Sequence, residues 1–193
     1  MKNPPVTGHP TKDSVITIEP FRTLEEIAAV RNVILSQRDR AMFMLGINSN
    51  LRASDLLRVR AEDVDWMEGK LTVRERKTKK KRIIPLGAAT LALLADCLPL
   101  TGEGLLFPSN KGGQPLTIGA WNNRIKLWAR KAGLTGNYGA RSIRKSWARI
   151  QHEVYGVSIL NISVELNHSS LRQTYFYLCL TPPEQAEIFR NQI

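Results

Sequence analysis

The sequence predicts a mainly α-helical domain with a small antiparallel β-sheet. Apolar residues recur at helical spacing in several segments, and capping signals precede some of them. One central pair of segments instead alternates apolar and polar residues on either side of a basic turn, which is the pattern of a β-hairpin. The composition, with 42% hydrophobic and 23% charged residues among 193, is that of a folded globular protein.

The first elements are predicted to be helices. Thr23 and Glu26 have the spacing of a capping box, and apolar residues follow on one helical face. Residues 41–47 are almost entirely apolar and indicate a buried helix, which Asn48-Ser49-Asn50 is expected to break. We expect another helix to begin near Leu51.

The middle of the chain is predicted to form the hairpin, and the rest is predominantly helical. Residues 70–74 and 82–86 are the two strands, and residues 88–98 are an Ala- and Leu-rich helix. Residues 99–115 contain the Gly and Pro residues of a loop. The later predicted helices are residues 118–132, 140–154, 157–166, 171–178 and 183–190.

Two parts are expected along the chain. Residues 1–20 include several Pro and Gly residues, so we expect a flexible leader there. Residues 21–193 are expected to form one domain, a length sufficient to bury a core.

The charge predicts a polyanionic partner. The chain has 28 Lys and Arg against 17 Asp and Glu, a net charge of +11 and a pI near 10.1. Neutralising phosphates releases condensed counterions and favours association, although charge alone does not separate DNA from RNA, a ribosome or an anionic membrane surface.

The compartment is expected to be the cytoplasm. No apolar run approaches the roughly 20 residues of a membrane span, and the first residues lack the pattern of a signal peptide. Cys97 and Cys179 have no C-x-x-C spacing and are interpreted as reduced core residues.

Two arginines, a histidine and a tyrosine form the candidate catalytic set. Arg52 lies in the first half, and Arg144, His168 and Tyr177 follow in the last third. Planar guanidinium groups match the non-bridging oxygens of a phosphodiester with paired hydrogen bonds. A phenol oxygen can attack that phosphate and store the broken bond as a phosphotyrosine ester. Such chemistry needs neither a metal ion nor ATP, and we expect no cofactor.

These residues lie in motifs that resemble those of the tyrosine recombinases, the family of phage integrases and Xer-type enzymes. The matching segments are Asn50-Leu51-Arg52-Ala53-Ser54-Asp55-Leu56-Leu57, Lys77-Thr78, Arg82-Ile83-Ile84-Pro85-Leu86, Arg141-Ser142-Ile143-Arg144, Leu166-Asn167-His168-Ser169-Ser170 and Thr174-Tyr175-Phe176-Tyr177. Each motif alone is weak, but their joint order and spacing over residues 21–190 make the resemblance specific. It implies the catalytic-domain fold of that family.

The resemblance also implies a role for each residue. Arg52, Arg144 and Arg141 bind the phosphate, and His168 donates a hydrogen bond to it. Tyr177 forms a 3′-phosphotyrosyl link.

Two further roles follow from the same resemblance. Lys77 protonates the departing 5′ oxygen, and Asp55 occupies the family's acidic position and orients its neighbours. Lys79 is an alternative to Lys77, because the whole basic turn is also compatible with solvated contact to the DNA backbone. Tyr175 is an alternative nucleophile, but on a helix it points about 200° away from Tyr177, and the spacing from His168 favours Tyr177.

The sequence departs from the family pattern in three respects. Arg141 stands where a histidine is usual, and since arginine does not accept a proton near neutral pH, any base role falls to His168 or water. Asn50 and Asn167 replace glycines, and asparagine tolerates left-handed backbone. The 20 residues before Phe21 are too few for the separate N-terminal DNA-clamping domain of the family, so we expect either a catalytic fragment or a naturally short enzyme.

Basic residues outside the catalytic set are candidate DNA contacts, although a solvated basic face is the alternative interpretation. These candidates are Lys79, Lys80 and Lys81 in the turn, and Arg124, Lys126, Arg130 and Lys131 in the predicted helix 118–132.

The function expected from these observations is that of a site-specific recombinase or integrase catalytic domain acting on double-stranded DNA in a prokaryotic nucleoid. Four protomers would act on paired sites, and a monomer is the alternative without DNA. The tail from Leu178 onward packs either on a neighbouring protomer or on its own domain. The rival functions are a DNA-binding regulator without cleavage activity, a topoisomerase-like relaxer, and an RNA or ribosome binder.

Overall fold

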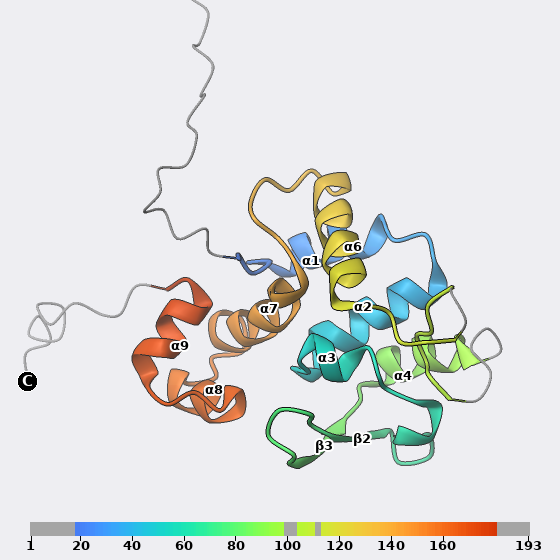
Figure 1. Cartoon of the computed structure of the whole chain (residues 1–193). Helices are drawn as coiled ribbons and strands as arrows, with labels where there is room; N and C mark the ends of the chain where they lie inside the picture. Colours follow the sequence, from blue (N-terminus) through green and yellow to red (C-terminus); the bar gives the residue numbers. More distant parts are fainter. Residues whose placement is uncertain (1–17, 99–103, 111–112, 181–193) are drawn as a thin grey trace, which may run out of the picture.

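The structure is a computed structural model that describes residues 18–98, 104–110 and 113–180 (Figure 1). Its helices are α1 (Leu24–Asn32), α2 (Gln37–Ser49), α3 (Ala53–Leu56), α4 (Ala88–Ala95), α6 (Ile118–Lys131), α7 (Ala140–Glu153), α8 (Ile159–Leu166) and α9 (Leu171–Leu178), with a 3₁₀ turn, η1 (Ala61–Asp63). Its strands are β1 (Val64–Asp65), β2 (Lys70–Arg74) and β3 (Lys81–Pro85). The predicted fold class, mainly helical with a small antiparallel sheet, is confirmed.

The sheet is antiparallel in the order β1-β2-β3. The hairpin register pairs Lys70 with Pro85 and Arg74 with Lys81, so the basic turn lies at one end of the sheet. The two-residue strand β1 was not predicted, because so short a segment carries no alternation.

Side chains cap the starts of α1, α2, α6, α8 and α9. The hydroxyl of Thr23 accepts a hydrogen bond from the Glu26 amide at 3.2 Å, as its spacing predicted. Ser158 and Ser170 cap α8 and α9 in the same way. The helix expected near Leu51 begins at Ala53 and lasts one turn. The predicted helix 183–190 lies outside the described residues.

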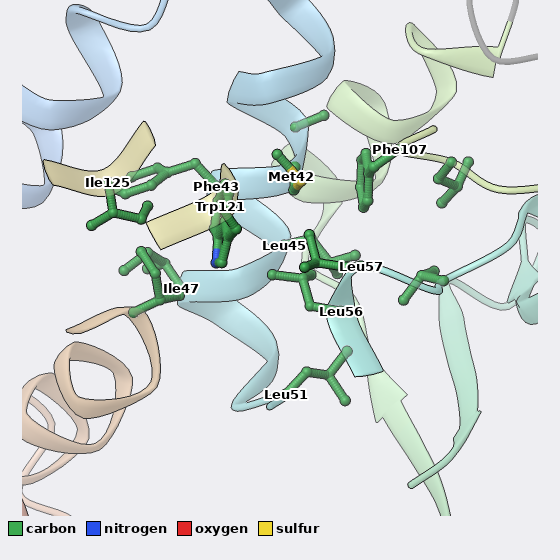
Figure 2. Packing of buried hydrophobic residues seen from close by; sticks show 14 of the residues in the cluster. Met42, Phe43, Leu45, Ile47, Leu51, Leu56, Leu57, Phe107, Trp121 and Ile125 are labelled. Carbon is green, nitrogen blue, oxygen red and sulfur yellow. The ribbon is translucent and has the colours of Figure 1, made fainter. Parts of the chain in front are cut away.

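The main core surrounds α2, which is buried along most of its length. Phe43 is fully buried and its ring lies 6.2 Å from Phe21 and 6.3 Å from Trp128. Figure 2 shows Phe43, Leu45 and Ile47 of α2 in one cluster with Leu56 of α3 and with Trp121 and Ile125 of α6. The core thus ties the first half of the chain to α6 and α7.

A second, smaller core joins the last three helices. It consists of Ala148 on α7, Ile162 and Leu166 on α8, and Leu178 on α9, with Tyr177 packed at its edge. Leu178 therefore packs on its own domain, whereas the rest of the tail, with Ile188 and Phe189, lies outside the described residues. Figure 1 shows α8 and α9 beside α7, and the ion pair of Arg82 with Glu165 at 3.4 Å brings the hairpin close to α8.

The segment before α1 is held on α7. The Phe21 amide donates to the Ser146 hydroxyl at 2.7 Å, and the Glu19 amide donates to the Asn137 carbonyl at 2.9 Å. Ile18, Glu19 and Pro20, which fall in the expected leader, are thus part of the packed domain. Within the described residues no helix is long and apolar enough to cross a membrane.

Replacing Phe43 with alanine should lower the free energy of unfolding by about 3–5 kcal/mol, because the emptied site lies between fixed aromatic neighbours. Denaturant unfolding measures the change. Leu35, whose side chain is 86% exposed, is the control, and its alanine variant should change the free energy by less than about 0.5 kcal/mol. Equal losses in the two variants would contradict this description of the core.

Candidate active site

A cleft of about 590 Å³ lies between α8 and α9 on one side and α3 and the β2–β3 turn on the other. Every residue of the predicted catalytic set lines it. These residues are Arg52, Lys77, Arg141, Arg144, His168 and Tyr177.

Helix α7 contributes two of the arginines. Arg144 is buried, and its Nη2 donates to the Leu166 carbonyl at 3.3 Å, while its buried Nη1 has no hydrogen-bond partner among the residues that the structure describes. A buried cationic donor without an acceptor is costly, so this nitrogen is suited to an incoming anion. Arg141 lies one turn earlier and is exposed at the cleft.

Arg52 is placed by a backbone turn and an ion pair. Asn50 ends α2 in the left-handed conformation, with φ of 53°, which accounts for asparagine replacing the usual glycine. Arg52 follows as the N-cap residue of α3, and its Nη1 lies 2.8 Å from a carboxylate oxygen of Glu75.

Glu75 is a site residue that the sequence analysis missed. Its buried carboxylate also accepts hydrogen bonds from Thr78 at 2.6 Å and from Arg82 at 3.2 Å. Burial alone would raise the pKa of Glu75, but the hydrogen bonds from Thr78 and Arg52 outweigh it and the pKa lies below its ordinary value of 4.5. Glu75 therefore joins Arg52 to the basic turn. Its one signal in the sequence is that it is the single acidic residue in the run 74–82.

Asp55 acts on the same turn from the other side. Its Oδ1 accepts a hydrogen bond from the Arg76 amide at 3.1 Å, immediately before Lys77. Asp55 therefore contacts the backbone beside Lys77, whereas Arg52 forms its ion pair with Glu75.

The turn distinguishes the candidate lysines. Lys77 lines the cleft, whereas Lys79 is exposed with φ of 60° and is not among the lining residues. Lys80 is exposed and its Nζ lies 3.5 Å from Asn167, and Lys81 is exposed on β3. This placement favours Lys77 over Lys79.

His168 follows the left-handed Asn167 that ends α8. Its Nδ1 lies 3.0 Å from the Thr174 hydroxyl, which donates to the Ser170 carbonyl at 3.5 Å. In this arrangement Nδ1 carries the proton and Nε2 is an acceptor, so the neutral imidazole can donate a hydrogen bond to a phosphate, as the resemblance implies, only after Nε2 has taken up a proton. Burial, Arg144 and Arg52 all lower the pKa of His168 below 6.5, so its neutral form predominates near neutral pH.

Tyr177 lies on α9, and its ring centroid is 5.0 Å from that of His168 at an interplanar angle of 73°. Burial raises the pKa of Tyr177 above 10.0, and the charges of Arg144, Arg141 and Arg52 oppose this shift. The resting side chain is therefore a neutral phenol. Tyr175, the alternative nucleophile, is not among the residues that line the cleft.

The basic residues of α6 lie outside the cleft. Arg124 forms an ion pair with the buried Asp39 at 2.8 Å, which gives it a structural role. Lys126, Arg130 and Lys131 are exposed, so their contact with DNA stays a prediction.

Comparison with known proteins identifies the family. Residues 20–182 match the phage integrase family. The tyrosine recombinase XerC of Proteus mirabilis is 26% identical over 175 residues, which cover 86% of this chain and 56% of that protein. The probable integrase/recombinase YoeC of Bacillus subtilis is 30% identical over 164 residues, which cover 83% of this chain and 89% of that protein.

Solved structures show the same fold. This chain superposes on the XerA recombinase with a TM-score of 0.70 and 20% sequence identity. The match covers 95% of this chain and 64% of the XerA chain. A lambda integrase dimer bound to a COC′ core site has a TM-score of 0.66 at 21% identity and covers 84% of this chain and 48% of that one.

This chain belongs to the phage integrase family, and the XerC proteins that it matches are tyrosine recombinases. It spans about half the length of the XerC proteins that it matches.

Replacing Glu75 with glutamine should destabilise the protein in a pH-dependent way. At neutral pH the free energy of unfolding should fall by about 1.5–3 kcal/mol, because Arg52 and Arg82 lose a charged acceptor. The folded pKa of Glu75 is below the ordinary value of 4.5. Its contribution is therefore fully present above that value and is lost as the pH falls through the lower folded pKa.

Chemical unfolding across this pH range measures the difference between wild type and variant. Glu68→Gln is the matched control, because Glu68 pairs with Lys70 on the same hairpin but is 64% exposed. A difference that persists unchanged into acid, or that the control reproduces, would refute the role of Glu75.

Proposed function

We propose that this chain is the catalytic domain of a site-specific DNA recombinase that cleaves and rejoins strands through a 3′-phosphotyrosyl intermediate. The observation that carries the proposal is the convergence of Arg52, Arg144, His168 and Tyr177 on one cleft, with a buried guanidinium nitrogen of Arg144 left without a partner. Family membership supports the proposal, and so does the fold shared with lambda integrase, whose dimer was solved bound to a COC′ core site.

The chemistry begins with attack of the Tyr177 oxygen on a DNA phosphorus. A new oxygen–phosphorus bond forms, the bond from phosphorus to the 5′ oxygen breaks, and the strand end becomes a phosphotyrosine ester. Negative charge on the non-bridging oxygens is stabilised by Arg52 and Arg144, and preorganised charge of this kind is a dominant catalytic contribution. A 5′ hydroxyl reverses the step, and because the ester conserves the bond, resealing needs no ATP.

Two protons must move in the cleavage step. The phenol proton passes to the free Nε2 of His168 or to water, and Lys77 supplies the proton that the 5′ oxygen takes up. Arg141 does not accept a proton, but it lines the cleft as an additional cation. Its presence in place of histidine is therefore compatible with cleavage, provided that His168 or water acts as the base.

The wider assembly is also part of the proposal. Complete strand exchange requires four protomers on two duplexes, and the cytoplasm and nucleoid are the expected location. The exposed lysines of the β2–β3 turn, Lys79, Lys80 and Lys81, are positioned to contact DNA backbone beside the cleft.

Covalent capture tests the proposed function. We expect wild-type protein to form a covalent adduct, visible on a denaturing gel, with some members of a pool of nicked duplexes that have randomised flanks. Cleavage beside the nick releases a short fragment with its 5′ hydroxyl, so the strand cannot be resealed and the phosphotyrosine ester accumulates. Tyr177→Phe should abolish capture, since it lacks only the attacking oxygen, and Tyr175→Phe should retain it. Capture by Tyr177→Phe, or no capture by wild type from any such pool, would refute the proposal.

Arg144→Ala should slow adduct formation on the captured duplex by about a thousandfold, the effect typical of an arginine that stabilises a phosphoryl-transfer transition state. Single-turnover kinetics measure the rate. Lys80→Ala should weaken binding in a salt-dependent way while leaving the rate of the bound complex near that of wild type. If the two substitutions changed the rate and the binding equally, the rival function of an RNA or ribosome binder, which uses only the positive charge, would be favoured.

The rate of adduct formation should fall as the pH decreases through the pKa of His168, which lies below 6.5. Protonation occupies Nε2 and removes the acceptor for the phenol proton. His168→Gln should lower the rate about a hundredfold and abolish this acidic limb. An unchanged limb in the variant would show that another group is the base.

A further inference from the structure

Lys145 is a buried lysine next to Arg144 on α7, and it does not line the cleft. Its Nζ donates to the Ile18 carbonyl at 2.7 Å and to the Cys179 sulfur at 3.5 Å. The same nitrogen lies 5.2 Å from the centroid of the Tyr177 ring. A buried ammonium is costly unless its donors are satisfied, and here they face a carbonyl, a thiol and an aromatic ring.

These contacts join three separate parts of the chain. Ile18 belongs to the segment before α1, which is fixed on α7 by the hydrogen bond of Phe21 to Ser146. Cys179 is the C-cap residue of α9, in the left-handed conformation with φ of 57°. It is only partly buried, unlike Cys97, and so is not the core residue expected from the sequence. Lys145 thus anchors the end of the helix that carries Tyr177.

His168 and Lys145 both contact the Tyr177 ring. His168 meets it in an edge-to-face arrangement, and Lys145 lies over the ring. The electron-rich face of an aromatic ring attracts a cation, most strongly where water is excluded. The attraction increases when the phenol loses its proton, because part of the negative charge spreads into the ring.

We propose that Lys145 is a positioning residue for the nucleophile: its ammonium holds the Tyr177 ring in the cleft and favours the phenolate that attacks the phosphate. This inference rests on the proposed function and extends it to a residue that touches neither the DNA nor the phosphate. Two adjacent residues of α7 then act on Tyr177: Arg144 lines the cleft, and Lys145 lies over the ring.

The charged and titratable groups around the phenol come from every surrounding element. Arg141 and Arg144 lie on α7, Arg52 precedes α3, His168 lies between α8 and α9, and Cys179 ends α9. Burial lowers the pKa of Lys145 below 10.5, and the charge of Arg141 lowers it further. Cys179 and Glu19 act in the opposite direction. Replacing Lys145 leaves all the groups that line the cleft in place.

The test uses the full chain with three substitutions. Lys145→Met removes the charge and keeps an unbranched side chain, and Lys145→Arg keeps the charge. Lys70→Met is the control, because Lys70 is an exposed lysine on β2 whose ion pair is with the exposed Glu68. One readout is the single-turnover rate of adduct formation on the duplex captured by wild type. The other is the near-ultraviolet titration of Tyr177 in the free protein, obtained by difference from Tyr177→Phe.

Lys145→Met should slow adduct formation about tenfold, the effect of a desolvated cation–ring contact, and Tyr177 should titrate at higher pH. Lys145→Arg should recover most of the rate, and Lys70→Met should match wild type in both readouts. Gel-shift binding of the same duplex should be equal in all variants, since Lys145 lies outside the cleft.

An unchanged rate and titration in Lys145→Met would overturn the proposal. So would equal slowing in the Met and Arg variants with an unchanged titration, which would assign Lys145 a packing role only. Circular dichroism checks folding, and Lys145→Gln replaces the Met variant if that variant does not fold. If wild type captures no duplex, the proposed function fails, while the titration of Tyr177 still decides whether Lys145 acts on the phenol.

Discussion

The site depends on the burial of the Arg144 guanidinium where α7 meets the end of α8. One of its nitrogens is held by the Leu166 carbonyl and another has no partner in the structure, so a cation is kept partly unsatisfied at the wall of the cleft. The main core and the smaller core both include residues of α7, which makes this arrangement rigid. An anion that enters the cleft therefore meets donors that are already oriented, and little reorganisation is needed.

Arg52, in contrast, is held by an ion pair. Its partner, Glu75, is a buried carboxylate with three neighbouring donors, and the backbone of the same residue pairs with Lys79 and Lys80 across the turn. The position of the guanidinium and the shape of the lysine-bearing turn are thus coupled through one side chain. Asp55 reinforces the turn through the Arg76 amide. The two arginines are therefore held separately, Arg144 by Leu166 and Arg52 by Glu75, and we propose that the bound phosphate contacts both.

Most helices and the hairpin could be predicted from the sequence, because helical periodicity, strand alternation and capping serines and threonines are local signals. The six predicted catalytic residues that line the cleft were identified because spaced motifs resemble those of a known family. Glu75 was missed since a single acid in a basic run is normally interpreted as solvated, and only the fold shows that it is buried. Lys145 was missed for the same reason, because its ring contact spans 32 positions of sequence only through the packing of α9 on α7. Arg124 illustrates the converse: its helix is basic, but its guanidinium pairs with Asp39, 85 positions away.

The central claim is that Arg52, Arg144 and the Tyr177 hydroxyl enclose one phosphate-sized site. A crystal structure of the protein with orthovanadate, an analogue of the pentacoordinate phosphorus formed during transfer, tests this claim most directly. The account predicts one anion between the two guanidinium groups, with the Tyr177 oxygen at bonding distance from the vanadium. An anion bound elsewhere, or a Tyr177 side chain directed away from an occupied site, would contradict it.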